Sequence, residues 1–193
     1  MERLILASAS PQRKTLLAGL GVAFEVIHSG VDEEAVIEPD PAKRAVTLAR
    51  MKAEDVAAKN PGSWVIGCDT LVVAPDGTLL EKPADAKDAA RMLKAQSGGI
   101  SIVHSGLSLR SPDGKEVSGI SSSSVLFRKL SDKDVEWWVK TKLWEGRSGA
   151  FQIDGPGQLM IEKIEGDWTG IVGLPVYLLG DLMRTANAPF LEL

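Results

Sequence analysis

The chain has 193 residues, a length typical of one globular domain and sufficient to bury a core without disulfides or metals. Hydrophobic residues make up 44% and charged residues 25%, which excludes a disordered chain, a collagen and a disulfide scaffold. The 22 Lys and Arg against 26 Asp and Glu give a net charge of −4, which opposes broad binding to a nucleic-acid backbone. We therefore expect one domain over residues 1–193, no nucleic-acid partner, and basic residues that bind something small.

The cysteine content and the apolar segments bear on location. A lone cysteine, Cys68, cannot form an internal disulfide, which suits a reducing compartment. Residues 4–9 faintly resemble a signal peptide, but four apolar residues fall short of the usual core of about 7–15. The most apolar later stretch, 170–180, is interrupted by Gly173 and Pro175 and is far shorter than the ~20 residues of a membrane span. We expect a cytoplasmic protein without a membrane partner.

Apolar and amphipathic segments alternate without a low-complexity linker or an internal repeat, which favours an α/β or mixed α+β domain. Capping and turn residues set the boundaries: Ser10 and Pro11 begin a helix, for example, and Gly21 ends it. In chain order, the predicted elements are strand 3–7, helix 11–20, strand 24–28, helix 41–59, strand 63–74 with a hairpin into 79–80, helix 85–96, strands 100–110 and 116–127, a helix from 131, a glycine-rich loop 146–157, strand 159–164 and a helix from 175.

The first strand-to-helix turn carries two hydroxyls and an arginine, in Ser8-Ala-Ser10-Pro-Gln-Arg13. A helix N-terminus presents free N–H groups and partial positive charge to an anion. The spacing lacks the glycines and lysine of a P-loop, so a Walker-type NTPase is not supported. Taken alone, the motif is more simply explained as a helix N-cap.

Arg50 and Lys52 lie two residues apart on a predicted helix, so they point to different faces and at least one must leave the solvent side. A lysine that snorkels from an amphipathic helix is the commoner explanation for Lys52.

Asp69 ends an apolar run. A carboxylate at a strand end beside a cleft can hold a metal or remove a proton from water, but it can equally be a turn residue. Lys82 follows a predicted hairpin, where a surface lysine is ordinary.

Other reactive arrangements have little support. His28 and His104 do not form a zinc spacing with Cys68, and there is no Gly-x-Ser-x-Gly elbow for a Ser-His-Asp hydrolase. The adjacent Trp137 and Trp138 can form a base-stacking platform, but such pairs are more often one core residue and one rim residue.

Taken in order, the motifs form a series that covers nearly the whole chain, and this series resembles the Maf-like nucleotide pyrophosphatases, also called septum-formation proteins. The resemblance implies a twisted mixed sheet flanked by helices around a deep cleft, similar to the inosine triphosphate pyrophosphatases, and a homodimer. The motifs that carry it are Ser8-x-Ser10-Pro-x-Arg13 with Leu16-Leu17, Asp32-Glu33, Ala49-Arg50-x-Lys52-Ala53, Gly67-x-Asp69-Thr70, Glu81-Lys82-Pro83, Ser97-Gly98 and Val172-Gly173-Leu174-Pro175.

The resemblance implies attack of water on the α-phosphorus of a nucleoside triphosphate, which gives the monophosphate and pyrophosphate. It assigns Asp69 as the proton acceptor or, alternatively, mainly as a metal ligand, with Lys52 and Lys82 as further catalytic residues. A divalent cation, Mg²⁺ or alternatively Mn²⁺, would take oxygen ligands from Glu33 and Asp69. The implied role is removal of non-standard or surplus nucleotides.

Binding of the nucleotide is implied for Ser8 and Arg13 at the phosphates and for Gln12, Thr70 and Asp154 at the base. The family usually carries Arg where this chain has Gln12, and its thymidine and uridine triphosphate enzymes carry Gln where Asp154 stands. Thr70 agrees with that pyrimidine group. We therefore expect pyrimidine or broad specificity.

Two other functions remain open. One is a pyrophosphatase of the 7-methyl-GTP type, and the other is a nucleotide-binding regulator of cell division. Asp69 together with Lys52 and Lys82 favours catalysis, because a sensor needs the cations but no group that activates water.

Overall fold

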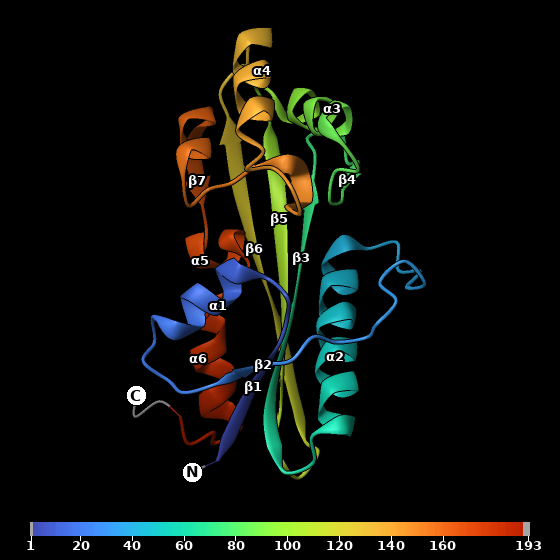
Figure 1. The fold of residues 1–193 in the computed structure, drawn as a ribbon, viewed down its shortest axis with the longest axis vertical. Helices are drawn as coiled ribbons and strands as arrows, with labels where there is room; N and C mark the ends of the chain where they lie inside the picture. The colour runs from blue at the N-terminus through green and yellow to red at the C-terminus, as the bar shows by residue number, and fades with distance from the viewer. Residues whose placement is uncertain (1, 191–193) are drawn as a thin grey trace.

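The computed structural model describes residues 2–190, in which six α-helices, seven strands and two short 3-10 helices follow one another. The chain forms an elongated body, with β1 and α6 in the lower part of the view in Figure 1. The elements are β1 (Arg3–Ala7), α1 (Pro11–Ala18), β2 (Glu25–Val26), α2 (Pro41–Lys59), β3 (Ser63–Val73), β4 (Leu79–Leu80), α3 (Ala86–Gln96), β5 (Ile100–Arg110), β6 (Glu116–Phe127), α4 (Asp132–Thr141), η1 (Ser148–Ala150), η2 (Pro156–Met160), β7 (Ile161–Glu165), α5 (Trp168–Val172) and α6 (Val176–Thr185).

One mixed sheet runs through the described chain in the order β2-β1-β3-β5-β6-β7, with β4 paired to β3. Strand β1 is parallel to β2 and β3, and the other pairs are antiparallel. The long strands β3, β5 and β6 extend along the molecule and join its lower part to its upper part (Figure 1). The predicted α/β class, with a mixed sheet flanked by helices, is confirmed.

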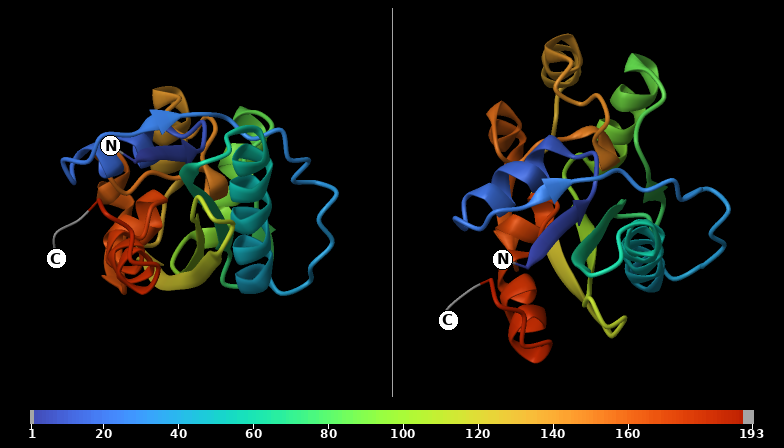
Figure 2. Two further views of the ribbon diagram at one scale, coloured as in Figure 1. Left: turned by 90° about the horizontal axis from the view of Figure 1, so that it is seen from below. Right: turned by 60° about the horizontal axis from the view of Figure 1, so that its bottom comes forward.

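Alternate residues of β1 enter two different cores, because successive side chains of a strand point to opposite faces of the sheet. Leu4 and Leu6 pack in the core shared with α1 and α6, whereas Ile5 and Ala7 pack in the core shared with α2. Figure 2 shows α2 and α6 on opposite sides of the sheet. The lower part of the molecule is therefore covered on both faces.

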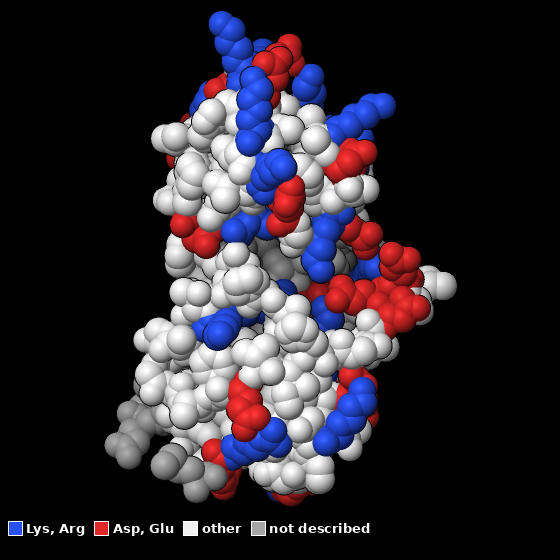
Figure 3. Space-filling view, viewed as in Figure 1, with Lys and Arg blue, Asp and Glu red and all other residues white. Residues whose placement is uncertain are grey.

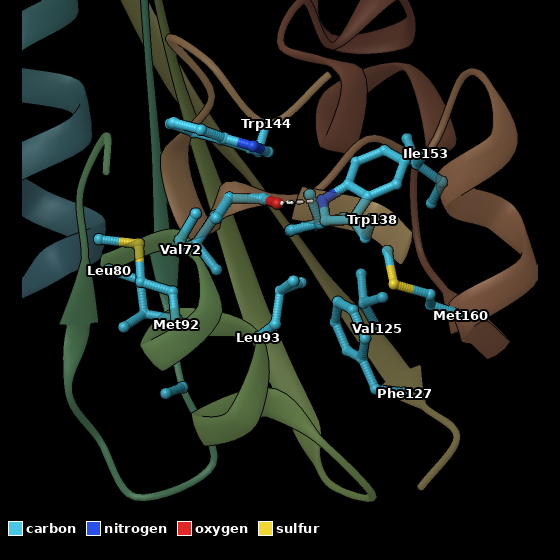
Figure 4. Close-up of a cluster of buried hydrophobic side chains, with 14 of the residues drawn as sticks. Val72, Leu80, Met92, Leu93, Val125, Phe127, Trp138, Trp144, Ile153 and Met160 are labelled. Carbon is cyan, nitrogen blue, oxygen red and sulfur yellow. Dashed lines mark hydrogen bonds between the residues drawn. The ribbon is translucent and has the colours of Figure 1, made fainter. Parts of the chain in front are cut away.

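A further core lies under α3 and α4 in the upper part of the molecule (Figure 4). Trp138 is fully buried in it and donates its Nε1–H to the carbonyl oxygen of Ala150 at 2.7 Å. Its neighbour Trp137 is 38% exposed. The prediction of one core and one rim tryptophan is confirmed.

Two glycines allow α2 to lie directly against the sheet. A Cβ at Gly67 of β3 would come within 2.0 Å of the Ala49 carbonyl oxygen, and one at Gly106 of β5 within 2.2 Å of the Ala45 carbonyl oxygen. No side chain fits between the helix backbone and these strands. The same close approach brings the side chain of Lys52 to Asp69 in the middle of β3.

Several predicted boundaries are corrected. Strand 24–28 is reduced to Glu25–Val26, because β2 is an edge strand that pairs only with β1. The first helix ends at Ala18, and the last strand is shifted to Ile161–Glu165 because η2 occupies the residues before it. The expected loop at 146–157 contains η1, and α5 was missed because five residues with a central glycine show no helical period. Within residues 2–190, no helix has both the length and the apolar content needed to cross a bilayer.

Candidate active site

A cleft of about 830 Å³ opens between the lower and upper parts of the molecule. Figure 3 shows it as a hollow with basic side chains inside and a group of acidic side chains on one rim. Its walls come from the start of α1, the loop before α2, α2 itself, the middle of β3, the segment after β4 and the segment around η1. All nine predicted site residues line it: Ser8, Gln12, Arg13, Glu33, Lys52, Asp69, Thr70, Lys82 and Asp154.

Lys52 joins two carboxylates at the floor of the cleft. Its Nζ lies 2.6 Å from Asp69 Oδ1 and 2.8 Å from Glu33 Oε1. The side chains of Lys52 and Asp69 are only 8% and 6% exposed, while that of Glu33 is 43% exposed. Arg50, two residues earlier, is exposed and pairs with Glu116 at 2.8 Å. The two cations do point to different faces, but the interpretation of Lys52 as a snorkelling surface lysine is wrong.

Asp69 keeps one oxygen available. Oδ1 accepts from Lys52, whereas Oδ2 is buried and has no hydrogen-bond partner among the residues that the structure describes. A buried carboxylate oxygen without a donor is costly unless a ligand or water satisfies it. Asp69 is therefore the side chain of this cluster best placed to accept a proton or a cation from the cleft.

Glu33 is held in its charged form. Burial raises the pKa of its carboxyl, but the hydrogen bond and charge of Lys52, with the charges of Lys82 and Arg13, outweigh that effect and leave the pKa below its ordinary value. Lys52 contacts this carboxylate directly at 2.8 Å, and Lys82 and Arg13 act on it only through their charges. This end of the cleft is the one suited to an anionic ligand that carries several charges.

The guanidinium of Arg13 makes four hydrogen bonds within the protein. Its Nε donates to the Gly173 carbonyl at 2.8 Å, its Nη1 to Ser8 Oγ at 3.1 Å and to the Cys68 carbonyl at 3.0 Å, and its Nη2 to Thr70 Oγ1 at 3.1 Å. Gly173 has φ +130°, a conformation that favours glycine. Arg13 thus braces α1 against β3 and the turn before α6, and it acts on a ligand through its charge more than through free donors.

Thr70 belongs to the same brace. Its hydroxyl accepts from Arg13 and lies 3.0 Å from Ser105 Oγ, which in turn donates to the Gly170 carbonyl at 2.6 Å. Because the hydrogen of Ser105 is used on Gly170, Thr70 must donate its own to Ser105. The Thr70 hydroxyl has no hydrogen left to offer a base.

Ser8 and the start of α1 face the cleft. Ser8 Oγ accepts from the Ser10 amide at 3.2 Å and from Arg13, so its own hydrogen is available to a ligand. Ser10 caps the helix as predicted, accepting from the Arg13 amide, and its hydroxyl donates to Gln12 Oε1 at 3.2 Å. The amides of this first turn and the Ser8 hydroxyl form a set of donors for a phosphate.

Two arginines in the walls were not predicted. Arg44 of α2 joins Glu81 Oε1 at 3.0 Å to the carbonyl of Glu33 at 3.3 Å, and so links the segment of Lys82 to the loop before α2. Arg147 lies in the other wall, with Nη1 3.6 Å from Asp154 Oδ1. Neither arginine lies in one of the sequence motifs or at a spacing that indicates a binding site. Only the folded structure shows that they line the cleft.

Similarity to known proteins identifies the family of this chain. The sequence model of Maf-like proteins matches residues 3–186. The chain belongs to this family.

Similar curated proteins include a dTTP/UTP pyrophosphatase of Deinococcus radiodurans, 44% identical over 96% of this chain and 93% of the relative, and one of Syntrophotalea carbinolica, 46% identical over 90% and 80%. A dTTP/UTP pyrophosphatase of Pyrococcus furiosus is 38% identical over 97% of both chains. Among solved structures, a nucleoside-triphosphatase (dITP/XTP pyrophosphatase) of Mycobacterium abscessus is similar with a TM-score of 0.42 and 16% identity over 66% of this chain and 75% of that one.

Two carboxylates in the cleft of this Maf-like protein fit part of the ligand set of a divalent cation. Within residues 2–190, no three His, Cys, Asp or Glu side chains form a complete metal cage. Glu33 and Asp69 nevertheless bring two carboxylates to one lysine, and Asp69 Oδ2 is buried without a partner. Mg²⁺ is usually bound by one or two carboxylates, with phosphates and waters completing its ligands.

Proposed function

We propose that this Maf-like protein is a nucleoside triphosphate pyrophosphatase that acts on uridine and thymidine triphosphates and releases the monophosphate and pyrophosphate. The observation that carries the proposal is the buried Asp69, a residue that lines the cleft, with Lys52 on one oxygen and no hydrogen-bond partner on the other among the described residues. Several relatives covering nearly the whole chain bear the name dTTP/UTP pyrophosphatase, which supports the same activity and base class.

In the proposed reaction, the oxygen of a water molecule forms a bond to the α-phosphorus, and the bond from that phosphorus to the bridging oxygen breaks. The electron pair leaves with pyrophosphate, and the proton of the water passes to Asp69 Oδ2. Lys52 fixes the carboxylate by holding Oδ1 at 2.6 Å. Preorganised positive groups stabilise charge that develops on the phosphates, and Lys52, Lys82 and the α1 amides supply them here.

Glu33 and Asp69 would hold the divalent cation, Mg²⁺ or Mn²⁺. When bound, such a cation neutralises phosphate charge and helps to orient the triphosphate. The Ser8 hydroxyl donates to a phosphate oxygen, and Arg13 keeps Ser8 in place. Each of these roles belongs to a side chain that lines the cleft.

Product analysis tests the proposal. The purified protein is incubated with UTP, dTTP and the other common triphosphates in Mg²⁺ or Mn²⁺, and the first products are separated and identified. We expect the monophosphate and pyrophosphate. Formation of the diphosphate and orthophosphate as first products would contradict the placement of the α-phosphorus near Asp69, and no turnover of any triphosphate would reject the activity.

A further inference from the structure

One face of α2 lines the cleft. Arg44, Leu48 and Lys52 all lie in the cleft wall and follow one another at intervals of four residues. Side chains at this interval share a face of a helix. Lys52 contacts Asp69 and Glu33. Arg44 lies about two turns closer to the start of the helix, and its contacts lead to a different part of the cleft.

The guanidinium of Arg44 holds two segments that are far apart in the sequence. Nη1 donates to Glu81 Oε1 at 3.0 Å, and Nη2 donates to the backbone carbonyl of Glu33 at 3.3 Å. A guanidinium is planar and presents its donors in a fixed fork, so the two acceptors are held at a set spacing. Arg44 therefore bridges the loop before α2 and the segment that follows β4.

Glu33 is held by α2 at both its side chain and its backbone. It lies between Val26, where β2 ends, and Pro41, where α2 begins, in a segment without a helix or strand. Lys52 binds its carboxylate at 2.8 Å, and Arg44 binds its carbonyl at 3.3 Å. Loss of Arg44 would remove the contact of α2 with the backbone and leave the carboxylate held through the flexible side chain of Lys52.

Lys82 directly follows the other residue of the bridge. Its predecessor Glu81 accepts from Arg44 with its carboxylate and from the Gly149 amide with its carbonyl, at 3.1 Å. Pro83 comes next, and a proline fixes its own φ and restricts the residue before it to extended backbone. Lys82 is exposed and lines the cleft, on a backbone restrained from both sides. The bond from Arg44 ties this segment to α2.

The bridge adds little to the stability of the fold. Arg44 Nε is buried and has no hydrogen-bond partner among the described residues, and a buried donor without a partner destabilises the folded state. The Arg44 side chain is 13% exposed, but that of Glu81 is 57% exposed, and an ion pair with so exposed a member contributes little to the free energy of unfolding. The effect of the bridge is therefore on the positions of two groups in the cleft.

We propose that Arg44 is a positioning residue, which sets the spacing between the Glu33 carboxylate and the Lys82 ammonium so that both act on one bound triphosphate. The inference rests on the proposed function, in which Glu33 holds the divalent cation and Lys82 stabilises charge on the phosphates. The hydrogen bonds of Arg44 go to protein groups, so it acts through these two residues. A misplacement of about 1 Å in such groups can lower a rate on the order of 100-fold.

Turnover of UTP by variants tests the bridge. Arg44→Met keeps the length of the side chain without its donors and should lower kcat/KM by roughly 10- to 100-fold, the loss typical when a residue that orients a metal ligand is removed. Arg44→Lys restores the charge but cannot hold two acceptors in a fork, so it should recover only part of the loss.

Arg50→Met is the matched control. Arg50 lies on the same helix and pairs with Glu116 at 2.8 Å outside the cleft, so its loss should leave the activity unchanged. Full recovery of activity in Arg44→Lys would show that charge alone matters and would overturn the inference. An effect of Arg44→Met no larger than that of Arg50→Met would also overturn it.

A double-mutant cycle tests whether Arg44 acts through Glu81. Glu81→Met removes one acceptor of the bridge. If the two residues act as a unit, Arg44→Met should lower kcat/KM by a clearly smaller factor in the Glu81→Met protein than in the wild type. If the two factors multiply, Arg44 does not position the segment of Lys82, and the inference is wrong. Thermal midpoints of all variants are measured alongside, so that loss of folded protein is not counted as loss of activity.

Ligand binding separates this inference from the proposed function. A non-hydrolysable UTP analogue is titrated by calorimetry into each folded variant in Mg²⁺. We expect Arg44→Met to bind it at least about tenfold more weakly than the wild type, and Arg50→Met to bind it equally well. If no triphosphate is hydrolysed but this difference is measured, the positioning role stands and the activity does not. If hydrolysis occurs and Arg44→Met has the turnover and affinity of the wild type, the positioning role is refuted while the activity stands.

Discussion

At the scale of single residues, the site depends on how neighbouring groups share hydrogen-bond donors. Asp69 has one oxygen on Lys52 and one without a partner, whereas Arg13 uses four of its five N–H groups within the protein and Thr70 donates its only hydrogen to Ser105. Groups without a partner are candidates to act on a ligand, whereas groups bonded within the protein hold the side chains of the site in position. We therefore expect substitutions of the two kinds of residue to have different effects on activity and stability.

Replacing Asp69 with Asn tests the proton acceptor. Asn has nearly the same shape, and we expect Asp69→Asn to keep the fold while lowering turnover by about 10²- to 10⁴-fold, the loss typical of a general acid or base. Turnover is measured together with the thermal midpoint. The control is Asp181→Asn, which removes a carboxylate that pairs with Arg184 on α6. Activity within a few-fold of wild type would remove Asp69 from the mechanism.

The depressed pKa of Glu33 predicts how stability depends on pH. Because the folded state favours the charged carboxylate, Glu33 stabilises the protein above its ordinary pKa of 4.5, and this contribution is lost as pH falls through the lower pKa of the folded state. Urea unfolding of the wild type and Glu33→Gln should therefore differ most near neutral pH, and the difference should shrink in acid. A difference that stayed constant with pH would contradict this assignment.

At the scale of elements, the approach of α2 to the sheet decides where Lys52 lies. Gly67 and Gly106 remove side chains from the contact, so the helix backbone lies against β3 and β5. Lys52, one turn from the contact at Ala49, then reaches Asp69 at 2.6 Å. The glycines thus contribute to the site without touching a ligand.

Gly67→Ala tests this dependence. The new Cβ would meet the Ala49 carbonyl oxygen at 2.0 Å, so α2 must move away, and we expect a loss of about 1–3 kcal/mol in the free energy of unfolding together with lower turnover. Gly30→Ala is the matched control, since its Cβ meets nothing closer than 3.8 Å. Denaturant unfolding and turnover of both variants are compared. Equal behaviour of the two would show that the close approach is not needed.

At the scale of the whole molecule, two parts with separate cores share three long strands, and the cleft lies between them. The proposed cation ligands, Glu33 and Asp69, both contact Lys52 in this cleft. A cation would therefore need the phosphates to complete its site. The fold itself rests on apolar cores.

Metal removal should accordingly affect activity and leave the fold intact. We expect EDTA to abolish pyrophosphate release and added Mg²⁺ to restore it. The thermal midpoint without nucleotide should be the same with or without Mg²⁺, whereas a non-hydrolysable UTP analogue should raise it more when Mg²⁺ is present. Calorimetric scans of the four mixtures measure this. A large stabilisation by Mg²⁺ alone would reveal a preformed metal site.

Much of the fold was predictable because its signals are local. The apolar strand 3–7, the helix begun by Ser10 and Pro11 and the helix from 131 each depend on signals within a few residues, and each appears where predicted. What failed was short or dependent on neighbours: α5 was too brief for a period, and β2 is limited by its place at the edge. Prediction from local sequence signals therefore succeeds for the long elements and fails for the short ones.

The sequence by itself determined the family, the class of fold and the residues that would line one cleft, because a series of motifs in fixed order carries that information. Only the tertiary structure decided that Lys52 is buried on Asp69, that Arg13 is a brace and that Arg147 meets Asp154. The physical reason is that hydrogen bonding and burial of a charged side chain depend on groups far away in the sequence. A sequence motif identifies a charged residue, but only the fold decides whether the hydrogen-bond donors and acceptors of its side chain are already used within the protein.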